Sequence, residues 1–139
     1  MPHLTLSLSA GRPLIDIFVG VSQARREALT AASQPVPSPI STRALVDTGA
    51  SCTCIDLTVL TQLGIPSTGT TPVLTPSTDQ TPHTANQYDV SIAIVFGSQS
   101  NPFRILYAAH TMPVVDADLR PQGILALIGR DILGTAMLQ

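Results

Sequence analysis

The sequence contains no lysine and no tryptophan, and only 12% of its 139 residues are charged. Its seven basic residues are all arginines scattered along the chain, so it lacks the basic block that a nucleic-acid-binding protein needs. No apolar run reaches the length of about 18 residues that a transmembrane helix requires. The sequence therefore predicts neither a nucleic-acid partner nor a membrane segment.

Cysteine is also scarce. The two cysteines, Cys52 and Cys54, are too few for a scaffold held together by disulfide bonds. We expect their side chains to point to opposite faces of the chain, so that they do not bridge each other. The start of the sequence shows no basic segment followed by a long apolar stretch, which is the pattern of a signal peptide. These features favour a cytoplasmic location.

What the sequence does have is typical of an all-β domain. Hydrophobic residues make up 44% of the chain, which is enough for one domain, residues 1–139, around one packed core. Thr, Ser, Val, Ile and Pro are abundant, as in short strands and turns. Apolar and β-branched runs predict strands over residues 4–8, 13–21, 42–46, 52–55, 70–74, 87–96, 103–108 and 124–128. Such a series predicts a closed barrel or a sandwich.

One or two short helices are expected among these strands. Asp56 is placed to cap a helix over residues 57–63, because its side chain can accept hydrogen bonds from the first turn. Gly64 would end that helix. A second helix is predicted to open at Gly129-Arg130-Asp131.

Two further segments stand apart from the regular strand pattern. Residues 22–41 are rich in proline towards their end and predict an exposed loop insertion, in which residues 24–32 could form a short helix. Residues 70–95 hold two strand candidates separated by a polar, turn-forming stretch, and we expect them to form a β-hairpin.

The segment that carries chemistry is Ala44-Leu45-Val46-Asp47-Thr48-Gly49-Ala50-Ser51. Its apolar residues deliver the carboxylate of Asp47 to the end of a buried strand. Thr48 and Gly49 then make a tight turn, and the absence of a side chain lets the Gly49 backbone donate its N–H to the carboxylate. The tripeptide Asp-Thr-Gly alone is a weak signal and is more often an ordinary turn at the end of a strand.

A second segment decides between these interpretations. Ala126-Leu127-Ile128-Gly129-Arg130-Asp131-Ile132-Leu133 joins bulky apolar residues, a glycine and the start of a helix. Together, the two segments resemble the retropepsin-like (retroviral-type) aspartic proteases, and especially their single-domain cellular and bacterial members. In that family the second segment packs beneath the catalytic loop. The resemblance therefore assigns a supporting structural role to Leu127, Ile128, Gly129 and Arg130.

The resemblance implies the fold and the chemistry. The fold is the all-β acid-protease (retropepsin) fold, and the activity is that of an aspartic endopeptidase with no cofactor and no metal. One Asp-Thr-Gly is half of a site, and the chain is too short for two lobes, so the active species is expected to be a homodimer that pairs Asp47 with its copy. Thr48, Gly49 and Ala50 would support the loop.

The predicted hairpin stands where the family carries the flap that closes over an extended polypeptide substrate. Its tip would contact that substrate through Ser77, Thr78, Asp79 and Gln80. This assignment follows from the resemblance, because the tip itself carries no distinctive motif.

The sequence also departs from the family pattern in two places. Retroviral members often carry an acidic residue where Ser51 stands, so Arg130 needs another partner, and we expect Asp131 or Asp56. Viral members also have a further terminal strand in the dimer sheet, and here residues 4–8 would replace it unless the domain is trimmed. The alternative function is therefore a catalytically weak or inactive domain for dimerisation or peptide binding, although the intact Asp-Thr-Gly favours the enzyme.

Overall fold

The computed structural model describes residues 7–9, 12–73, 83–98 and 101–136. The predicted flap residues 77–80 and most of the first expected strand, over residues 4–8, lie outside this part of the chain. Within it, no helix is long and apolar enough to cross a membrane.

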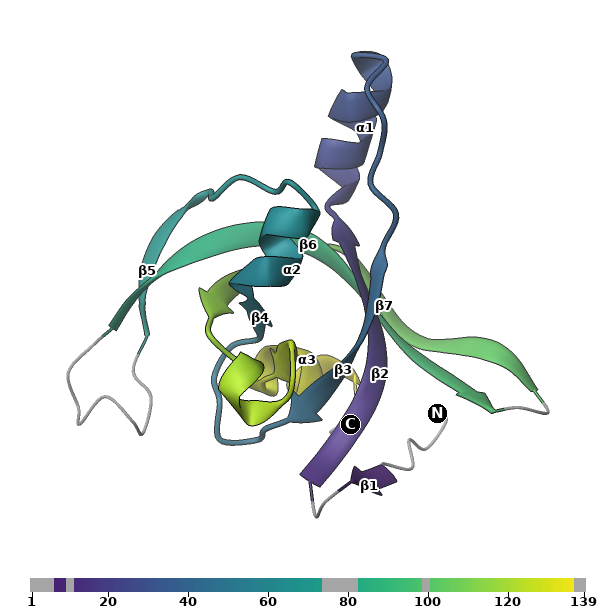
Figure 1. Ribbon diagram of the computed structural model, residues 1–139, viewed down its shortest axis with the longest axis vertical. Helices are drawn as coiled ribbons and strands as arrows, with labels where there is room; N and C mark the ends of the chain where they lie inside the picture. The colour runs from purple at the N-terminus through teal and green to yellow at the C-terminus, as the bar shows by residue number, and fades with distance from the viewer. Residues whose placement is uncertain (1–6, 10–11, 74–82, 99–100, 137–139) are drawn as a thin grey trace.

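Eight strands form a single sheet in the described residues (Figure 1). They are β1 (Ser7–Ser9), β2 (Arg12–Val21), β3 (Ile40–Val46), β4 (Cys54–Asp56), β5 (Gly69–Val73), β6 (His83–Ser98), β7 (Asn101–Ala117) and β8 (Ala126–Ile128). Their order is β1-β2-β3-β8-β4-β7-β6-β5. An additional pairing of β2 with β6 joins the strands from β2 to β6 into a closed barrel, which confirms the predicted all-β fold.

In the described residues three α-helices accompany the barrel, where the sequence predicts one or two besides the short helix that could form over residues 24–32. They are α1 (Gln23–Ala31), α2 (Leu57–Gln62) and α3 (Arg130–Ala136), and a short 3-10 turn spans Arg120–Gln122. The additional helix is α1, which lies in the segment predicted as an exposed loop. Ser22 caps it by accepting a hydrogen bond from the Arg25 N–H, and none of its residues is buried. Figure 1 accordingly shows α1 projecting away from the barrel.

Strands β6 and β7 are longer than the sequence predicts. The predicted strands span residues 87–96 and 103–108, whereas β6 spans His83–Ser98 and β7 spans Asn101–Ala117. The pairing between them shifts register between Val90 and Ile92 and again between Ile94 and Val95. Such bulges let a long strand bend, so one pair of strands both closes the barrel and extends beyond it. Cross-strand pairing here overrides the local turn signals at which the predicted strands end.

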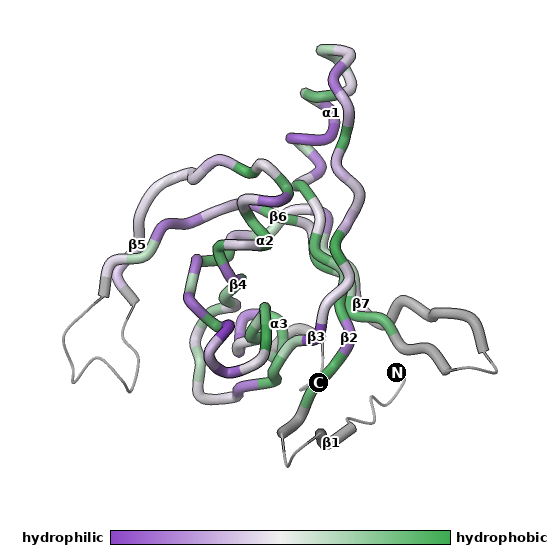
Figure 2. The backbone as a smooth tube through the Cα atoms, viewed as in Figure 1, coloured by the Kyte–Doolittle hydropathy of each residue, from purple (hydrophilic) through white to green (hydrophobic). Residues whose placement is uncertain are grey.

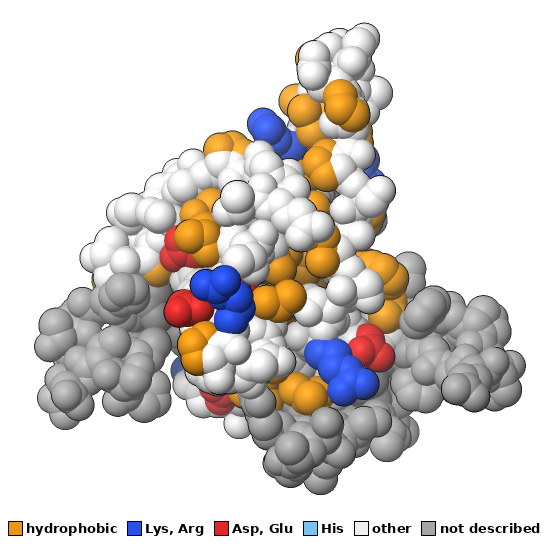
Figure 3. All heavy atoms as spheres, viewed as in Figure 1, with side chains coloured by type: hydrophobic (Ala, Val, Ile, Leu, Met, Phe, Trp, Pro, Cys, Tyr) orange, Lys and Arg blue, Asp and Glu red, His pale blue; other side chains and the backbone are white. Residues whose placement is uncertain are grey.

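The core is aliphatic and lies inside the barrel. Figure 2 shows hydrophobic residues concentrated where β2, β6 and β7 cross. The largest fully buried side chains include Ile17, Ile55, Leu60, Ile92, Ile94, Ile128, Ile132 and Leu133. Three of these belong to β8 and α3, so the second motif of the sequence is anchored in the core. In the described part of the face drawn in Figure 3, charged side chains are few, as expected from the composition.

Candidate active site

The loop that carries Asp47 is built over strand β8. Strand β8 runs parallel to β3, with Val46 opposite Ile128, and antiparallel to β4, with Cys54 opposite Leu127. The chain leaves β3, passes over the end of β8 and returns in β4, so one short strand holds both ends of the loop. Asp47 is the first residue of that loop.

Asp47 is fixed through its backbone and through its side chain. Its N–H donates to the Ile128 carbonyl at 3.0 Å, and its carbonyl accepts from the Ala50 N–H at 3.2 Å. The Gly49 N–H donates to its Oδ1 atom at 2.9 Å, as the sequence predicts. A Cβ atom at Gly49 would lie 3.2 Å from the same oxygen, so a side chain there would crowd the carboxylate. Asp47 itself is half-buried, whereas Thr48 and Gly49 are exposed in the single chain.

The second motif holds the loop from below. The Arg130 N–H donates to the Ala50 carbonyl at 2.9 Å. A Cβ atom at Gly129 would lie 2.5 Å from the carbonyl oxygen of Cys52 and 3.0 Å from that of Ala50. A glycine is therefore required where the two motifs touch. The structure thus brings together the residues that the sequence singled out around Asp47 and those of the Leu127–Arg130 segment.

Sequence reasoning missed one connection between the two motifs, which runs through Thr53 and Asp131. Thr53 is completely buried. Its N–H and its hydroxyl donate to the two carboxylate oxygens of Asp131 at 2.9 and 2.7 Å, and its hydroxyl accepts from the Gly129 N–H at 3.3 Å. The signal in the sequence was a lone hydroxyl residue between two cysteines, which does not identify a partner distant in the chain.

Comparison with known protein families matches residues 38–132 to aspartyl proteases. That range contains the Asp47 loop, β8 and the start of α3. The chain belongs to the aspartyl protease family. A comparison with curated proteins finds no match. Membership confirms the resemblance drawn from the two motifs and makes peptide-bond hydrolysis the general activity of the family to which the chain belongs.

The two cysteines of this aspartyl protease do not lie as expected. Both are free and half-buried, and the Cys54 side chain turns back towards Cys52, with its Sγ atom 4.0 Å from the Cys52 carbonyl oxygen. The expectation that they point apart was wrong, because residues two apart in an extended chain share a face. The hydrogen bond from Cys54 lowers the pKa of Cys52 to about 7 and, together with burial, raises the pKa of Cys54.

Arg130 is exposed, and the two acids proposed as its partners are engaged elsewhere. Asp131 accepts the bonds from Thr53 described above. Asp56 is buried, and its two oxygens accept hydrogen bonds from Thr58 and from the Leu119 N–H at 2.8 Å. Burial acts to raise the pKa of Asp56, but these bonds and the charge of Arg120 outweigh it and lower the pKa. A pairing of Asp56 with Arg130 finds no support, and a pairing with Asp131 stays a prediction.

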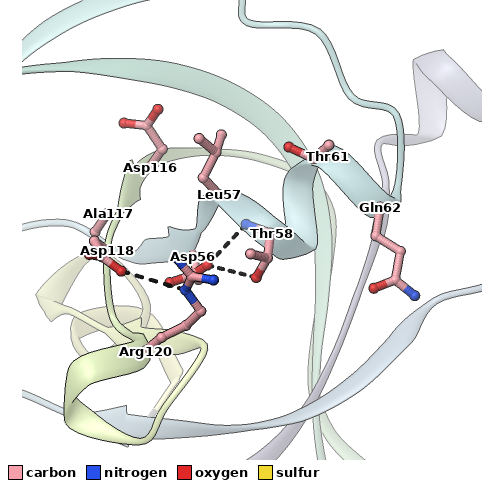
Figure 4. A pocket seen from close by; sticks show the side chains of 9 residues that line it. All are labelled: Asp56, Leu57, Thr58, Thr61, Gln62, Asp116, Ala117, Asp118 and Arg120. Atoms are coloured by element: carbon pink, nitrogen blue, oxygen red, sulfur yellow. Dashed lines mark hydrogen bonds and ion pairs between the residues drawn. The ribbon is translucent and has the colours of Figure 1, made fainter.

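An open pocket of about 600 Å³ lies beside Asp56, away from the Asp47 loop (Figure 4). Residues from α2 and from the end of β7 line it, together with Arg120, whose Nε lies 3.7 Å from Asp118. The lining does not include Asp47 or its neighbours in the loop. Among the described residues, no three His, Cys, Asp or Glu side chains gather in a way that could hold a metal ion.

Proposed function

We propose that the chain is an aspartic endopeptidase in which Asp47 pairs with Asp47 of a second copy across a two-fold axis. The observation that carries this proposal is the position of Asp47. It stands at the start of a loop seated on β8, with Gly49 orienting its carboxylate and with Thr48 and Gly49 exposed for contact. A single chain supplies one such loop, and the chemistry needs two carboxylates.

The reaction would proceed by general acid–base catalysis on a water molecule. Two carboxyl groups about 3 Å apart share one proton, because both cannot ionise cheaply. The ionised Asp47 takes a proton from the water, which attacks the carbonyl carbon of the scissile bond. The protonated Asp47 donates its proton to the carbonyl oxygen. The titration belongs to the pair and not to either residue.

The substrate would bind as an extended polypeptide beneath the hairpin. Strands β5 and β6 pair antiparallel from Gly69 opposite Gln87 to Val73 opposite His83, which supports the hairpin expected over residues 70–95. Strand β5 lies at the end of the strand order and can accept an added strand. The contacts of residues 77–80 with substrate, and the closing of this hairpin as a flap, stay predictions.

The test is digestion of a denatured polypeptide mixture over a range of mildly acidic pH, with new termini identified by mass spectrometry. The wild-type protein is compared with the Asp47→Asn variant, which keeps the shape of the side chain but cannot supply a carboxylate. Cleavage by the wild type alone supports the proposal. Absence of cleavage by wild-type protein that is folded and dimeric would favour the alternative, a dimerisation or peptide-binding domain.

Mixing the two proteins tests whether both carboxylates are needed. If each dimer requires two intact Asp47 residues, an equal mixture with freely exchanging subunits retains about one quarter of the activity of the same total amount of wild type. If each subunit acts alone, about one half remains. A value near one half would reject the shared site even if the wild type cleaves peptides.

A further inference from the structure

The segment between the Asp47 loop and β4 carries two thiols around the residue that joins the two motifs. Cys52 and Cys54 are both free and half-buried, and the Cys54 side chain turns back towards Cys52, with its Sγ atom 4.0 Å from the Cys52 carbonyl oxygen. Between them stands Thr53, completely buried. Aspartic protease chemistry uses no thiol, so the function proposed above leaves this pair unexplained.

We propose that Cys52 and Cys54 form a dithiol that peroxides oxidise to a reversible disulfide, and that this bond displaces Thr53 and loosens the support of the Asp47 loop. The effect on peptidase activity rests on the proposed function, whereas the oxidation itself does not. The co-reactant is a small peroxide such as hydrogen peroxide.

The chemistry assigns different roles to the two thiols. The Cys52 thiolate attacks one peroxide oxygen, the O–O bond breaks, and hydroxide leaves, so that the sulfur becomes a sulfenic acid. The Cys54 thiol then attacks that sulfur, the S–O bond breaks, and the hydroxyl group leaves as water with the thiol proton. The two sulfurs have together lost two electrons to the peroxide. The bond from Cys54 favours the thiolate at Cys52, which sets this order.

Closing the bond requires the backbone to move at Thr53. A disulfide between residues two apart closes a small ring that contains the whole backbone of Thr53, and the S–S bond accepts only a narrow range of geometries. The peptide units on both sides of Thr53 must therefore adjust to the ring. The N–H of this residue donates to Asp131, and its carbonyl accepts from the Val115 N–H at 3.2 Å. Neither bond tolerates rotation of the peptide units on the two sides of Thr53.

The displacement reaches the Asp47 loop by two short routes. The Thr53 hydroxyl accepts a hydrogen bond from the Gly129 N–H, and the Cys52 carbonyl occupies the space that a Cβ atom on Gly129 would need. Movement of the Thr53 hydroxyl or of the Cys52 carbonyl therefore shifts Gly129. The residue after Gly129 is Arg130, whose N–H donates a hydrogen bond to the Ala50 carbonyl in the Asp47 loop. A disulfide that forces its surroundings out of place is easily reduced, so the change is reversible by thiols.

The first part of the test measures the oxidation alone. Reduced protein is treated with hydrogen peroxide and followed by intact mass, with dimedone present in a parallel sample to capture sulfenic acid. The wild type is expected to lose two hydrogen atoms per chain without forming a link between chains. The Cys54→Ser variant should accumulate sulfenic acid at Cys52, and Cys52→Ser should react at least about tenfold more slowly than wild type.

The second part follows the structural consequence. Hydrogen exchange at the Thr53, Val115 and Arg130 amides should be faster in the oxidised wild type than in the reduced protein. Treatment with dithiothreitol should restore the exchange rates of the reduced protein. Peroxide should not accelerate hydrogen exchange at these amides in the Cys52→Ser variant, which cannot form the disulfide. If the serine variants fold poorly, Cys54→Ala serves as the control in its place. Peptidase activity should fall and recover in step with exchange in the wild type.

The outcomes separate this inference from the proposed function. Links only between chains, or oxidation of Cys52→Ser at the wild-type rate, would overturn the dithiol. A disulfide that leaves exchange at Thr53 unchanged would overturn the coupling to the loop. Measurements of intact mass and of hydrogen exchange need no enzymatic turnover. A protein without peptidase activity therefore still tests both the disulfide and its coupling to the Asp47 loop.

Discussion

Gly129 lies so close beneath Cys52 that a Cβ atom on it would stand 2.5 Å from the Cys52 carbonyl oxygen and 2.7 Å from the carbonyl carbon. Both are main-chain atoms, so no side chain can rotate aside to make room. Two segments far apart in the sequence are thereby held in register at this contact, and the loop that carries Asp47 depends on it.

Gly129→Ala is therefore expected to destabilise the protein and disturb the loop. Relieving the overlap requires a backbone shift, and we expect a loss of about 2 kcal/mol in the free energy of unfolding. Denaturant unfolding at one protein concentration measures it. The matched control is Gly20→Ala, where the nearest atom, the Ser91 hydroxyl at 2.9 Å, can rotate away. Equal losses in the two variants would show that the contact at Gly129 has no special role.

The bond network of Thr53 predicts strong coupling with Asp131. Thr53→Val keeps the shape of the side chain but removes the hydroxyl, and it should cost about 1–2 kcal/mol in the free energy of unfolding. In an Asp131→Ala background the same change should cost much less, because the hydroxyl has already lost its acceptor. A double-mutant cycle measures the difference. As a control, Thr53→Val and Asp16→Ala should be additive within about 0.5 kcal/mol, since Asp16 belongs to an exposed ion pair with Arg43.

Asp56 predicts a pH dependence of stability. Burial opposes its ionisation, but the bonds from Thr58 and Leu119 and the charge of Arg120 leave its pKa below the usual value. A carboxyl group with a pKa lower in the folded state stabilises that state above its unfolded pKa of about 4. The contribution is lost as the pH falls through the folded pKa.

The measurement compares Asp56→Asn with wild type at pH 7 and in acid. In the variant an amide NH2 group replaces one of the two carboxylate oxygens and faces a hydrogen-bond donor, so the free energy of unfolding should fall by about 2 kcal/mol at pH 7. The difference in the free energy of unfolding between wild type and Asp56→Asn should become smaller in acid. Asp118→Asn, in the same pocket but in an exposed ion pair, should change little at either pH. A gap for Asp56→Asn that stays constant with pH would contradict the argument.

Cys52 should be alkylated at neutral pH. The hydrogen bond from Cys54 lowers its pKa from 9.0 to about 7, against the opposing effects of burial and of the charge on Asp131. The rate of reaction with iodoacetamide should therefore reach half its maximum near pH 7. Cys54→Ala removes the donor and should move the midpoint upwards. If the midpoint of the wild type lies near 9, the thiol pair is not bonded in solution.

The sequence predicts the barrel and the Asp47 loop well because both depend on local patterns. Alternating apolar residues locate most strands, and the Asp-Thr-Gly turn requires a glycine whose N–H meets the carboxylate, as the structure shows. Asp56 was also correctly placed as a helix cap, because the Asp side chain bonds the first turn within two residues. These interactions join residues that are neighbours in the chain.

Apart from the packing of the second motif beneath the Asp47 loop, which the family resemblance implies, the contacts between distant segments were not predicted. The second use of Asp56, as acceptor for the Leu119 N–H, and the bonds from Thr53 to Asp131 depend on the sheet order that brings the segments together. The lengths of β6 and β7 escaped for a similar reason. A proline such as Pro113 usually interrupts a strand, yet here it lies opposite Asp89 in the pairing of β6 with β7. The proximity of the two cysteines was missed because their side chains were wrongly expected on opposite faces of the chain.

The insertion of β8 between β3 and β4 also orders events in time. A ribosome synthesises Asp47 and its turn long before residues 126–128, yet Asp47 has no acceptor for its N–H until Ile128 arrives. Pairing between segments so distant forms late, after the entropy of closing the intervening chain has been overcome. A nascent chain therefore carries an Asp47 loop that is not yet held in place, and the peptidase activity proposed above can arise only after β8 has been made.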